Sequence, residues 1–223
     1  MAGQADDYYV RRWQDFQRLE RIRSHWWWRP GWALGRSLYT WYLTFEDAVE
    51  VHRLAAACQQ WIALPTLDPV APDGLHMTLQ PIGFTDEVPA PDIDAIADTA
   101  AVLCASLAPF ELTLAPVDAD RETVLLRVRP WEPVQRLRLA LREAIAAVRG
   151  PERVPGPVEG FAPHVTLCYC NAEADAAPLR TLLRSLPDTG PVSTTVRAAS
   201  LVRLNRDENV YRWTAVARVA LTG

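Results

Sequence analysis

The chain has 223 residues, of which 49% are apolar, so we expect one large domain or two closely packed lobes around a substantial core. Its formal net charge of −4 excludes a general nucleic-acid coat, because a protein that covers a long duplex needs a basic face. Any contact with RNA is therefore predicted to be local, at the end of a strand or with a small ligand.

The basic residues are all arginine, since the 23 Lys and Arg positions contain no lysine. This absence excludes a Walker-type phosphate loop, a Schiff-base nucleophile and the lysine–nucleotide intermediate of ATP-dependent ligases. Phosphate must then be bound by arginine side chains, hydroxyl groups or backbone amides, and the planar guanidinium is well suited to it. No cofactor is predicted.

The N-terminal residues 1–35 are predicted to form a helical and Trp-rich extension of a main domain that spans 36–223. A helix is expected over 7–24, where apolar side chains recur at helical spacing. An aromatic loop with helix-breaking Pro and Gly follows from His25 to Trp32. Its tryptophans have two open roles: stacking on a base while arginine binds phosphate, or packing the N-terminal helix against the sheet. We favour packing, because Trp is buried more often than it serves as a binding surface.

The main domain is predicted to alternate between strands and amphipathic helices that are separated by loops rich in Pro and Gly. Strands are expected over residues 37–45, 75–84, 110–117, 122–129, 164–170, 192–204 and 209–221. Helices are expected over residues 46–63, 91–107, 132–148 and 175–186. The pattern lacks a parallel β–α–β signature, so the fold class is predicted to be α+β.

Two copies of the pattern His-x-Thr-Leu lie 88 positions apart, at His76 and His164. Each copy follows a loop that contains Pro or Gly and opens an apolar strand. Because residues i and i+2 of a strand project from the same face, each copy presents an imidazole beside a hydroxyl, from Thr78 and Thr166. One such match is a weak signal, whereas two matches in a chain with four histidines are specific.

Paired imidazoles and hydroxyls are suited to opening a cyclic phosphate diester. Histidine has an ordinary pKa of about 6.5, so one imidazole can accept a proton from water while the other protonates the departing ribose oxygen. The threonine hydroxyls can donate to the non-bridging oxygens as charge builds up in the transition state. This chemistry needs no metal, and none is predicted.

These motifs resemble those of the 2H phosphoesterases, in particular the branch named for bacterial 2′,5′ RNA ligases and RNA 2′,3′-cyclic phosphodiesterases. The first motif continues as His76-x-Thr78-Leu79-x-x-x-Gly83, and the resemblance covers residues 36–221. It implies a bilobal fold in which two antiparallel sheets face a central cleft, with helices outside. It also implies that the two motif histidines hydrolyse 2′,3′-cyclic phosphates to 2′-phosphomonoesters, with ATP-independent 2′,5′ ligation as the reverse reaction.

Further residues are expected to bind substrate together with the two motif threonines. Tyr169 stands five residues after the second motif histidine, where the family often carries Arg or another polar group. Pro81 stands at the matching place after the first, where an aromatic residue is frequent. We expect Tyr169 to contact substrate, and Arg36 and Tyr39, at the start of a strand, to border the cleft.

The remaining histidines and two of the cysteines have weaker contexts. His52 lies in an amphipathic helix and His25 lies beside the aromatic loop, so both are predicted to be structural. By strand alternation Cys168 and Cys170 share a face with His164, but alternating positions surround a zinc ion poorly, and no Cys-x-x-Cys pair occurs. We therefore predict that these cysteines are apolar fillers.

Alternative functions stay open on sequence alone. The same motifs fit a 2H enzyme that acts on ADP-ribose 1″,2″-cyclic phosphate or on a 2′,5′-linked nucleotide, and an RNA-end binder with little catalysis. A structural interaction domain that uses the Trp-rich segment is a third possibility. The expected partner is an RNA terminus or a small cyclic nucleotide, bound by a monomer. The sequence shows no signal peptide or membrane-spanning run, so we expect a cytoplasmic protein with free thiols and no membrane contact.

Overall fold

The computed structural model describes residues 2–223 and forms an α+β fold with antiparallel sheets, as the sequence predicts. The helices are α1 (Ala2–Arg18), α2 (Val49–Trp61), α3 (Ala90–Ala105), α4 (Trp131–Arg149) and α5 (Ala177–Arg184). The strands are β1 (Arg21–Ile22), β2 (Leu38–Thr44), β3 (Leu67–Pro69), β4 (His76–Phe84), β5 (Phe110–Ala119), β6 (Thr123–Arg129), β7 (His164–Cys170), β8 (Ala174–Asp175), β9 (Val192–Val196), β10 (Ala198–Asn205) and β11 (Arg212–Ala220). Within the described residues, no helix has the length and apolar character that a membrane crossing requires.

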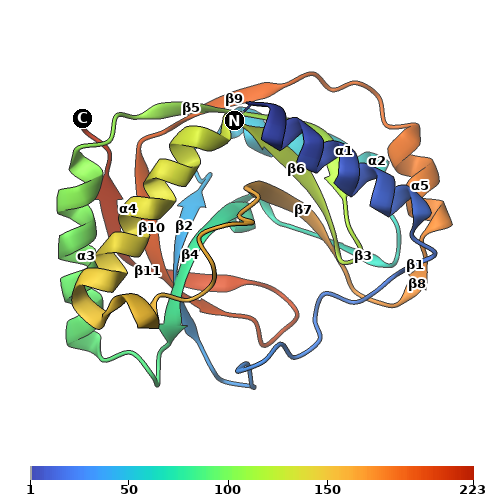
Figure 1. Cartoon of the computed structure of the whole chain (residues 1–223). Helices are drawn as coiled ribbons and strands as arrows, with labels where there is room; N and C mark the ends of the chain where they lie inside the picture. The colour runs from blue at the N-terminus through green and yellow to red at the C-terminus, as the bar shows by residue number, and fades with distance from the viewer. Residues whose placement is uncertain (1) are drawn as a thin grey trace.

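Two antiparallel sheets form the body of the molecule (Figure 1). One sheet has four strands in the order β11-β10-β2-β4, and the other has five in the order β3-β7-β6-β5-β9. Strand β4 lies at an edge of the first sheet and contacts β7 of the second. The two strands that begin with a His-x-Thr-Leu motif therefore meet where the sheets adjoin.

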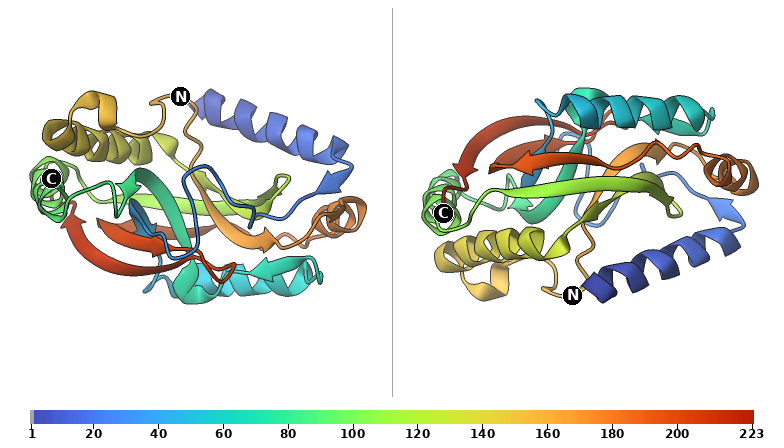
Figure 2. Two further views of the ribbon diagram at one scale, coloured as in Figure 1. Left: turned by 90° about the horizontal axis from the view of Figure 1, so that it is seen from below. Right: turned by 90° about the horizontal axis from the view of Figure 1, so that it is seen from above.

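Each motif strand follows a helix and pairs with the strand before that helix. In the first sheet β2 leads through α2 to β4, its antiparallel neighbour, and in the second β6 leads through α4 to β7, likewise antiparallel. The helices cross over between the sheets, because α2 contacts β7 and β9 whereas α4 contacts β4. Figure 2 shows α1 and α4 on one side of the sheets and α2 on the other. This exchange of helices ties the two sheets together.

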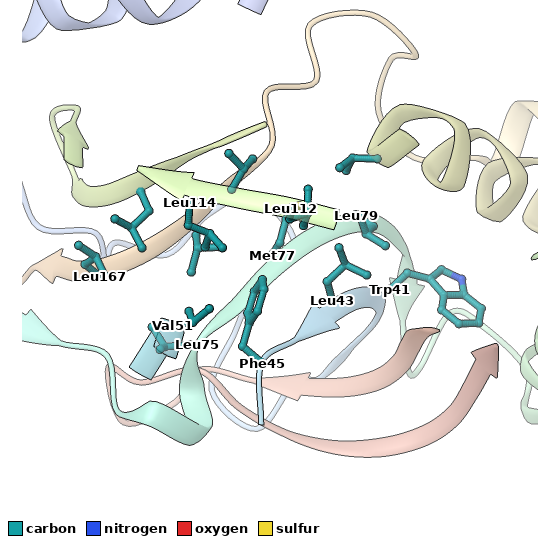
Figure 3. Packing of buried hydrophobic residues seen from close by; sticks show 14 of the residues in the cluster. Trp41, Leu43, Phe45, Val51, Leu75, Met77, Leu79, Leu112, Leu114 and Leu167 are labelled. Carbon is teal, nitrogen blue, oxygen red and sulfur yellow. The ribbon is translucent and has the colours of Figure 1, made fainter. Parts of the chain in front are cut away.

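A continuous apolar core lies between the sheets (Figure 3). Its buried members include Met77, Leu79, Leu112, Leu114 and Leu167. Because strand side chains alternate between faces, burial of Met77 turns His76 and Thr78 away from the core. A slip of one residue in register would bury the motif side chains instead, so core packing fixes the direction in which they point.

The N-terminal helix is anchored on the second sheet by Tyr9, whose side chain is buried. The Tyr9 hydroxyl donates to the Val128 carbonyl (3.0 Å) and accepts from the indole N–H of Trp131 (2.8 Å). It also accepts from the Val128 N–H (3.1 Å). One phenol thus joins α1 to the end of β6 and the start of α4.

Three local expectations are corrected by the fold. Helix α1 begins and ends earlier than the predicted 7–24, because residues 21–22 are extended and pair with β8, which buries Ile22. The predicted strand 192–204 is divided at Arg197, since β9 pairs with β5 and β10 pairs with β2 in the other sheet. The short strand β3 lies in a segment that the sequence predicts to be loop, and it pairs with β7.

We expect Tyr9→Phe to lower the free energy of unfolding by about 1–3 kcal/mol, because the buried N–H groups of Val128 and Trp131 lose their shared acceptor. Urea unfolding followed by circular dichroism measures the change. Tyr8→Phe is the matched control, because the Tyr8 hydroxyl has a single long contact with Arg12 (3.4 Å), and it should shift stability by less than about 0.5 kcal/mol. Equal effects of the two substitutions would contradict the anchoring role.

Candidate functional site

His76 and His164 open β4 and β7, and both imidazoles line one cavity where the two sheets adjoin. The volume of this cavity is about 280 Å³. Thr78 and Thr166 line the same cavity, so the fold brings together the four motif side chains from positions 88 residues apart.

A backbone hydrogen bond orients each imidazole. The Nδ1–H of His76 donates to the Gly74 carbonyl (2.8 Å), and the Nδ1–H of His164 donates to the Ala162 carbonyl (2.9 Å). In both cases the acceptor stands two residues before the histidine. A neutral imidazole that donates from Nδ1 carries a lone pair on Nε2. Each ring therefore offers a bare nitrogen for proton transfer.

Burial favours the neutral form of both imidazoles. It lowers the pKa of His76 to about 4, and the hydrogen bond to Gly74 opposes this shift while the nearby charge of His164 adds to it. Burial likewise lowers the pKa of His164, with the Ala162 carbonyl acting in the opposite direction.

A β-bulge in each motif strand brings a further residue to the cavity. The pairing of β4 with β2 skips Leu79, and the pairing of β7 with β6 skips Leu167. Each extra residue shifts the alternation by one, so Pro81 and Tyr169 face the cavity with the motif histidines. The expected position of Tyr169 beside the motif follows from this irregularity, because strict alternation would turn it away.

The same bulge overturns the predicted shared face of His164, Cys168 and Cys170. The histidine lines the cavity, whereas both cysteines are buried in the apolar core. All four cysteines of the chain are buried and free of disulfide bonds. Burial raises the pKa of Cys168 and Cys170 to about 12, so these thiols stay protonated. Their predicted role as apolar fillers is confirmed.

Three tyrosines form walls around the histidines. Tyr42 stacks on His76 with ring centroids 4.3 Å apart and planes at 19°. Tyr169 and Tyr211 meet edge to face at 5.3 Å, and the Tyr211 ring lies 5.9 Å from His76. Burial raises the pKa of all three phenols, so their hydroxyls are protonated at neutral pH and can donate hydrogen bonds.

The Trp-rich loop forms another wall, which corrects the expectation that it packs α1 against the sheet. His25 and Trp32 line the cavity, and the Trp26 ring lies 5.0 Å from that of Tyr169. In the left view of Figure 2 the segment between β1 and β2 crosses in front of the middle of the molecule. Helix α1 is instead held by Tyr9. The prediction that His25 is only structural is therefore incomplete.

Arg36 and Tyr39 do not line the cavity, in contrast to the sequence-based expectation. The Arg36 guanidinium forms ion pairs with Asp86 (2.9 Å) and Glu87 (2.6 Å) on the outer surface. Tyr39 packs against the apolar core. The cavity-facing residues of β2 are the alternate ones that end at Tyr42, and Tyr39 is out of phase with them.

Arg206 is a buried cation behind the cavity wall, with only 2% of its surface exposed. Its Nη2 donates to the His25 carbonyl (3.0 Å), and its Nη1 is buried without a hydrogen-bond partner among the described residues. The guanidinium carbon lies 5.7 Å from the ring centroids of both Trp32 and Tyr211. A positive charge in so apolar a setting favours an anion in the adjacent cavity.

Sequence reasoning missed Tyr42, Tyr211, His25 and Arg206. Tyr42 has a usable signal, because the alternation of β2 places it beside a motif once β2 is known to pair with β4. Arg206 and Tyr211 lie in the turn between β10 and β11, and His25 lies in a loop. No local pattern relates these three residues to the motifs, since only the folded chain brings them to the cavity.

Comparison with known proteins agrees with this arrangement. A family model described as the 2′-5′ RNA ligase superfamily matches residues 46–208. TT0787 of Thermus thermophilus is 25% identical with a TM-score of 0.62, over 84% of this chain and 98% of that chain. E. coli LigT is 21% identical with a TM-score of 0.62 in its complex with 3′-AMP, and 22% identical with a TM-score of 0.60 in its complex with NADP+. Both LigT comparisons cover 84% of this chain and 99% of LigT, and they show a shared fold. No curated protein matches the chain.

In the ligand-free protein we expect the His76 imidazole to be neutral at pH 6 and to become protonated near pH 4, because burial opposes its charge. The unfolded chain exposes His76 with an ordinary pKa of 6.5, so it binds the proton first as the pH falls. Above about pH 6.5 the ring is neutral in both the folded and the unfolded protein, so His76 makes its full contribution to the free energy of unfolding. It is lost as the pH falls toward 4, by up to about 1.4 kcal/mol per pH unit.

An NMR titration of the imidazole resonances gives the pKa of the folded protein, and urea unfolding between pH 7 and pH 4 gives the stability. The comparison variant is His76→Phe, which keeps a ring beside Tyr42 but cannot titrate. The decline of stability with falling pH should be shallower in the variant. Equal declines, or a titration midpoint of His76 near its ordinary value, would show that the ring is not held in a dry site.

Proposed function

Because this chain belongs to the 2′-5′ RNA ligase superfamily of 2H phosphoesterases, we propose that it opens 2′,3′-cyclic phosphates to 2′-phosphomonoesters without a metal. His76 and His164 serve as general acid and general base. The observation that carries the proposal is that both imidazoles line one cavity, each with its Nδ1 bound to a backbone carbonyl.

The reaction requires two proton transfers on opposite sides of phosphorus. The Nε2 of one histidine accepts a proton from water as the water oxygen bonds to phosphorus. The other histidine, as imidazolium, gives its proton to the 3′ oxygen as the P–O3′ bond breaks, which leaves the phosphate on O2′. Burial favours the neutral form of both rings, so the acid must gain its proton when the substrate binds. The negative charge of the phosphate diester supplies the reason, because a nearby anion raises the pKa of an imidazole.

Charge on the pentavalent transition state is stabilised by groups that already face the cavity. Thr78 and Thr166 line the cavity, and in this proposal their hydroxyls donate to the non-bridging oxygens. Arg206 adds a buried positive charge behind the wall without contacting the cavity itself. Many phosphate sites use lysine to stabilise the negative charge of the phosphate. This chain has no lysine, so hydroxyl groups and one buried arginine supply that stabilisation.

The proposed substrate is an RNA end or a small nucleotide. LigT has been crystallised with 3′-AMP, with NADP+ and with phosphate, so a protein of this fold accommodates nucleotides and phosphate. The cavity of about 280 Å³ lies near the lower limit for small-molecule pockets, a size that suits a terminal phosphate with its sugar. A panel of nucleoside 2′,3′-cyclic phosphates, a cyclic-phosphate oligonucleotide, ADP-ribose 1″,2″-cyclic phosphate and 2′,5′-linked dinucleotides identifies the preferred member.

We expect His76→Ala and His164→Ala each to lower kcat for nucleoside 2′,3′-cyclic phosphates by about 10²–10⁴-fold, because each removes one proton-transfer group. Hydrolysis is followed by chromatography of the 2′-phosphate product, with and without EDTA, and EDTA should have no effect on the wild-type rate. His52→Ala is the matched control, since His52 binds the Phe45 carbonyl outside the cavity, and its kcat should equal that of the wild type. Turnover that survives in folded variants of both motif histidines would refute the proposal.

A further inference from the structure

Building on the proposed function, we propose that the Tyr211 hydroxyl donates a hydrogen bond to a non-bridging oxygen of the bound phosphate, and that His25 is the positioning residue that directs it. Neither residue lies within 46–208, the part of the chain that the family model matches. The proposed device therefore comes from the Trp-rich loop and the β10–β11 turn, which surround the motif strands.

Tyr211 and His25 form a hydrogen-bonded pair at the cavity wall. The Tyr211 hydroxyl lies 2.8 Å from the Nε2 of His25, and both side chains line the cavity with the motif histidines. The His25 ring also packs on the Tyr169 ring, with centroids 4.4 Å apart. The Tyr211 ring centroid lies 5.9 Å from that of His76, so the pair is held beside the proposed proton-transfer groups.

The direction of the hydrogen bond follows from the other ring nitrogen of His25, Nδ1. The Nη2 of Arg29 lies 3.3 Å from this Nδ1 in hydrogen-bonding geometry, and a guanidinium can only donate. The Nδ1 is therefore the acceptor, so the neutral ring carries its hydrogen on Nε2. That N–H donates to the Tyr211 oxygen, which leaves the phenolic O–H free to point into the cavity. This tautomer is the reverse of the one at His76 and His164.

Glu122 supports this assignment. Its Oε2 lies 3.3 Å from the Nδ1 of His25, but the same oxygen accepts from the Nη2 of Arg29 at the shorter distance of 2.6 Å. Its Oε1 accepts from Arg23 and from the indole N–H of Trp27. The carboxylate therefore has three donors without an imidazole proton, and it serves to hold Arg29 against His25.

Burial keeps the pair in the protonation state that the donor role needs. It lowers the pKa of His25 to about 4, with the charge of Arg29 acting in the same direction, so the ring is neutral at pH 7. Burial raises the pKa of Tyr211, so the phenol keeps its proton. A phenol whose oxygen already accepts from His25 has its own O–H as the remaining donor, and a phosphate oxygen is the acceptor that the cavity chemistry provides.

A double-mutant cycle on the full chain tests the coupling. With cytidine 2′,3′-cyclic phosphate as substrate, we expect Tyr211→Phe to lower kcat/KM by about 10–10²-fold, because the donor binds the phosphate oxygen in the bound substrate and binds it more strongly in the transition state. His25→Phe, which keeps a ring against Tyr169, should lower kcat/KM by about tenfold, and the double variant should be no slower than Tyr211→Phe alone. His25→Gln retains an N–H donor near the position of Nε2 and should restore most of the rate. The positioning role would be overturned if the rate loss of the double variant equalled the product of the two single losses, or if Gln did not restore the rate. His52→Phe is the control for loss of a histidine elsewhere.

Two measurements test the inference without turnover, so that its failure can be told apart from failure of the proposed function. Imidazole ¹⁵N NMR should show the Nε2–H tautomer at His25 and the Nδ1–H tautomer at His76 and His164; an Nδ1–H tautomer at His25 would overturn the assignment. Inorganic phosphate should bind about tenfold more weakly to Tyr211→Phe than to the wild type, as calorimetry measures. An unchanged Kd would overturn the donor role. Surviving turnover in the motif-histidine variants bears on the proposed function alone.

Discussion

Two hydrogen bonds from imidazole to backbone, at Gly74 and Ala162, determine what the rest of the site can do. Each fixes a histidine in the tautomer that leaves Nε2 bare, and each acceptor belongs to the residue two positions before its histidine. The carbonyls are in place because the loops enter β4 and β7, whose inner faces are held by the apolar core. Core packing, strand register and proton-transfer geometry are therefore one connected constraint.

His76 is buried and His164 is half-buried, yet one of them must carry a positive charge in the proposed reaction. Burial favours the neutral form of His76, yet the proposed reaction requires one protonated imidazole. An anionic substrate resolves the conflict, because its charge favours the imidazolium at the moment of binding. The phenols of Tyr42 and Tyr211 do not compete for this charge, since burial keeps them protonated. In the proposed reaction the phosphate diester supplies that negative charge.

The sequence predicted the motif strands, the fold class and the four motif side chains at one site because those features follow from local alternation and a repeated pattern. It placed Tyr169 near the site, but the reason is a bulge at Leu167 that alternation alone does not show. It misplaced Tyr39, since the phase of β2 depends on its pairing with β4. The contribution of His25 was not predictable, because a loop residue reaches the cavity only through long-range packing of the Trp-rich segment.

The central claim is that His76 and His164 act on one phosphate from opposite sides. A crystal structure with a bound nucleoside 2′-phosphate tests it most directly. The account predicts a single phosphate in the cavity, with the Nε2 atoms of both histidines about 3 Å from different oxygens of that group. A phosphate that binds elsewhere, or that contacts only one of the two imidazoles, would contradict it.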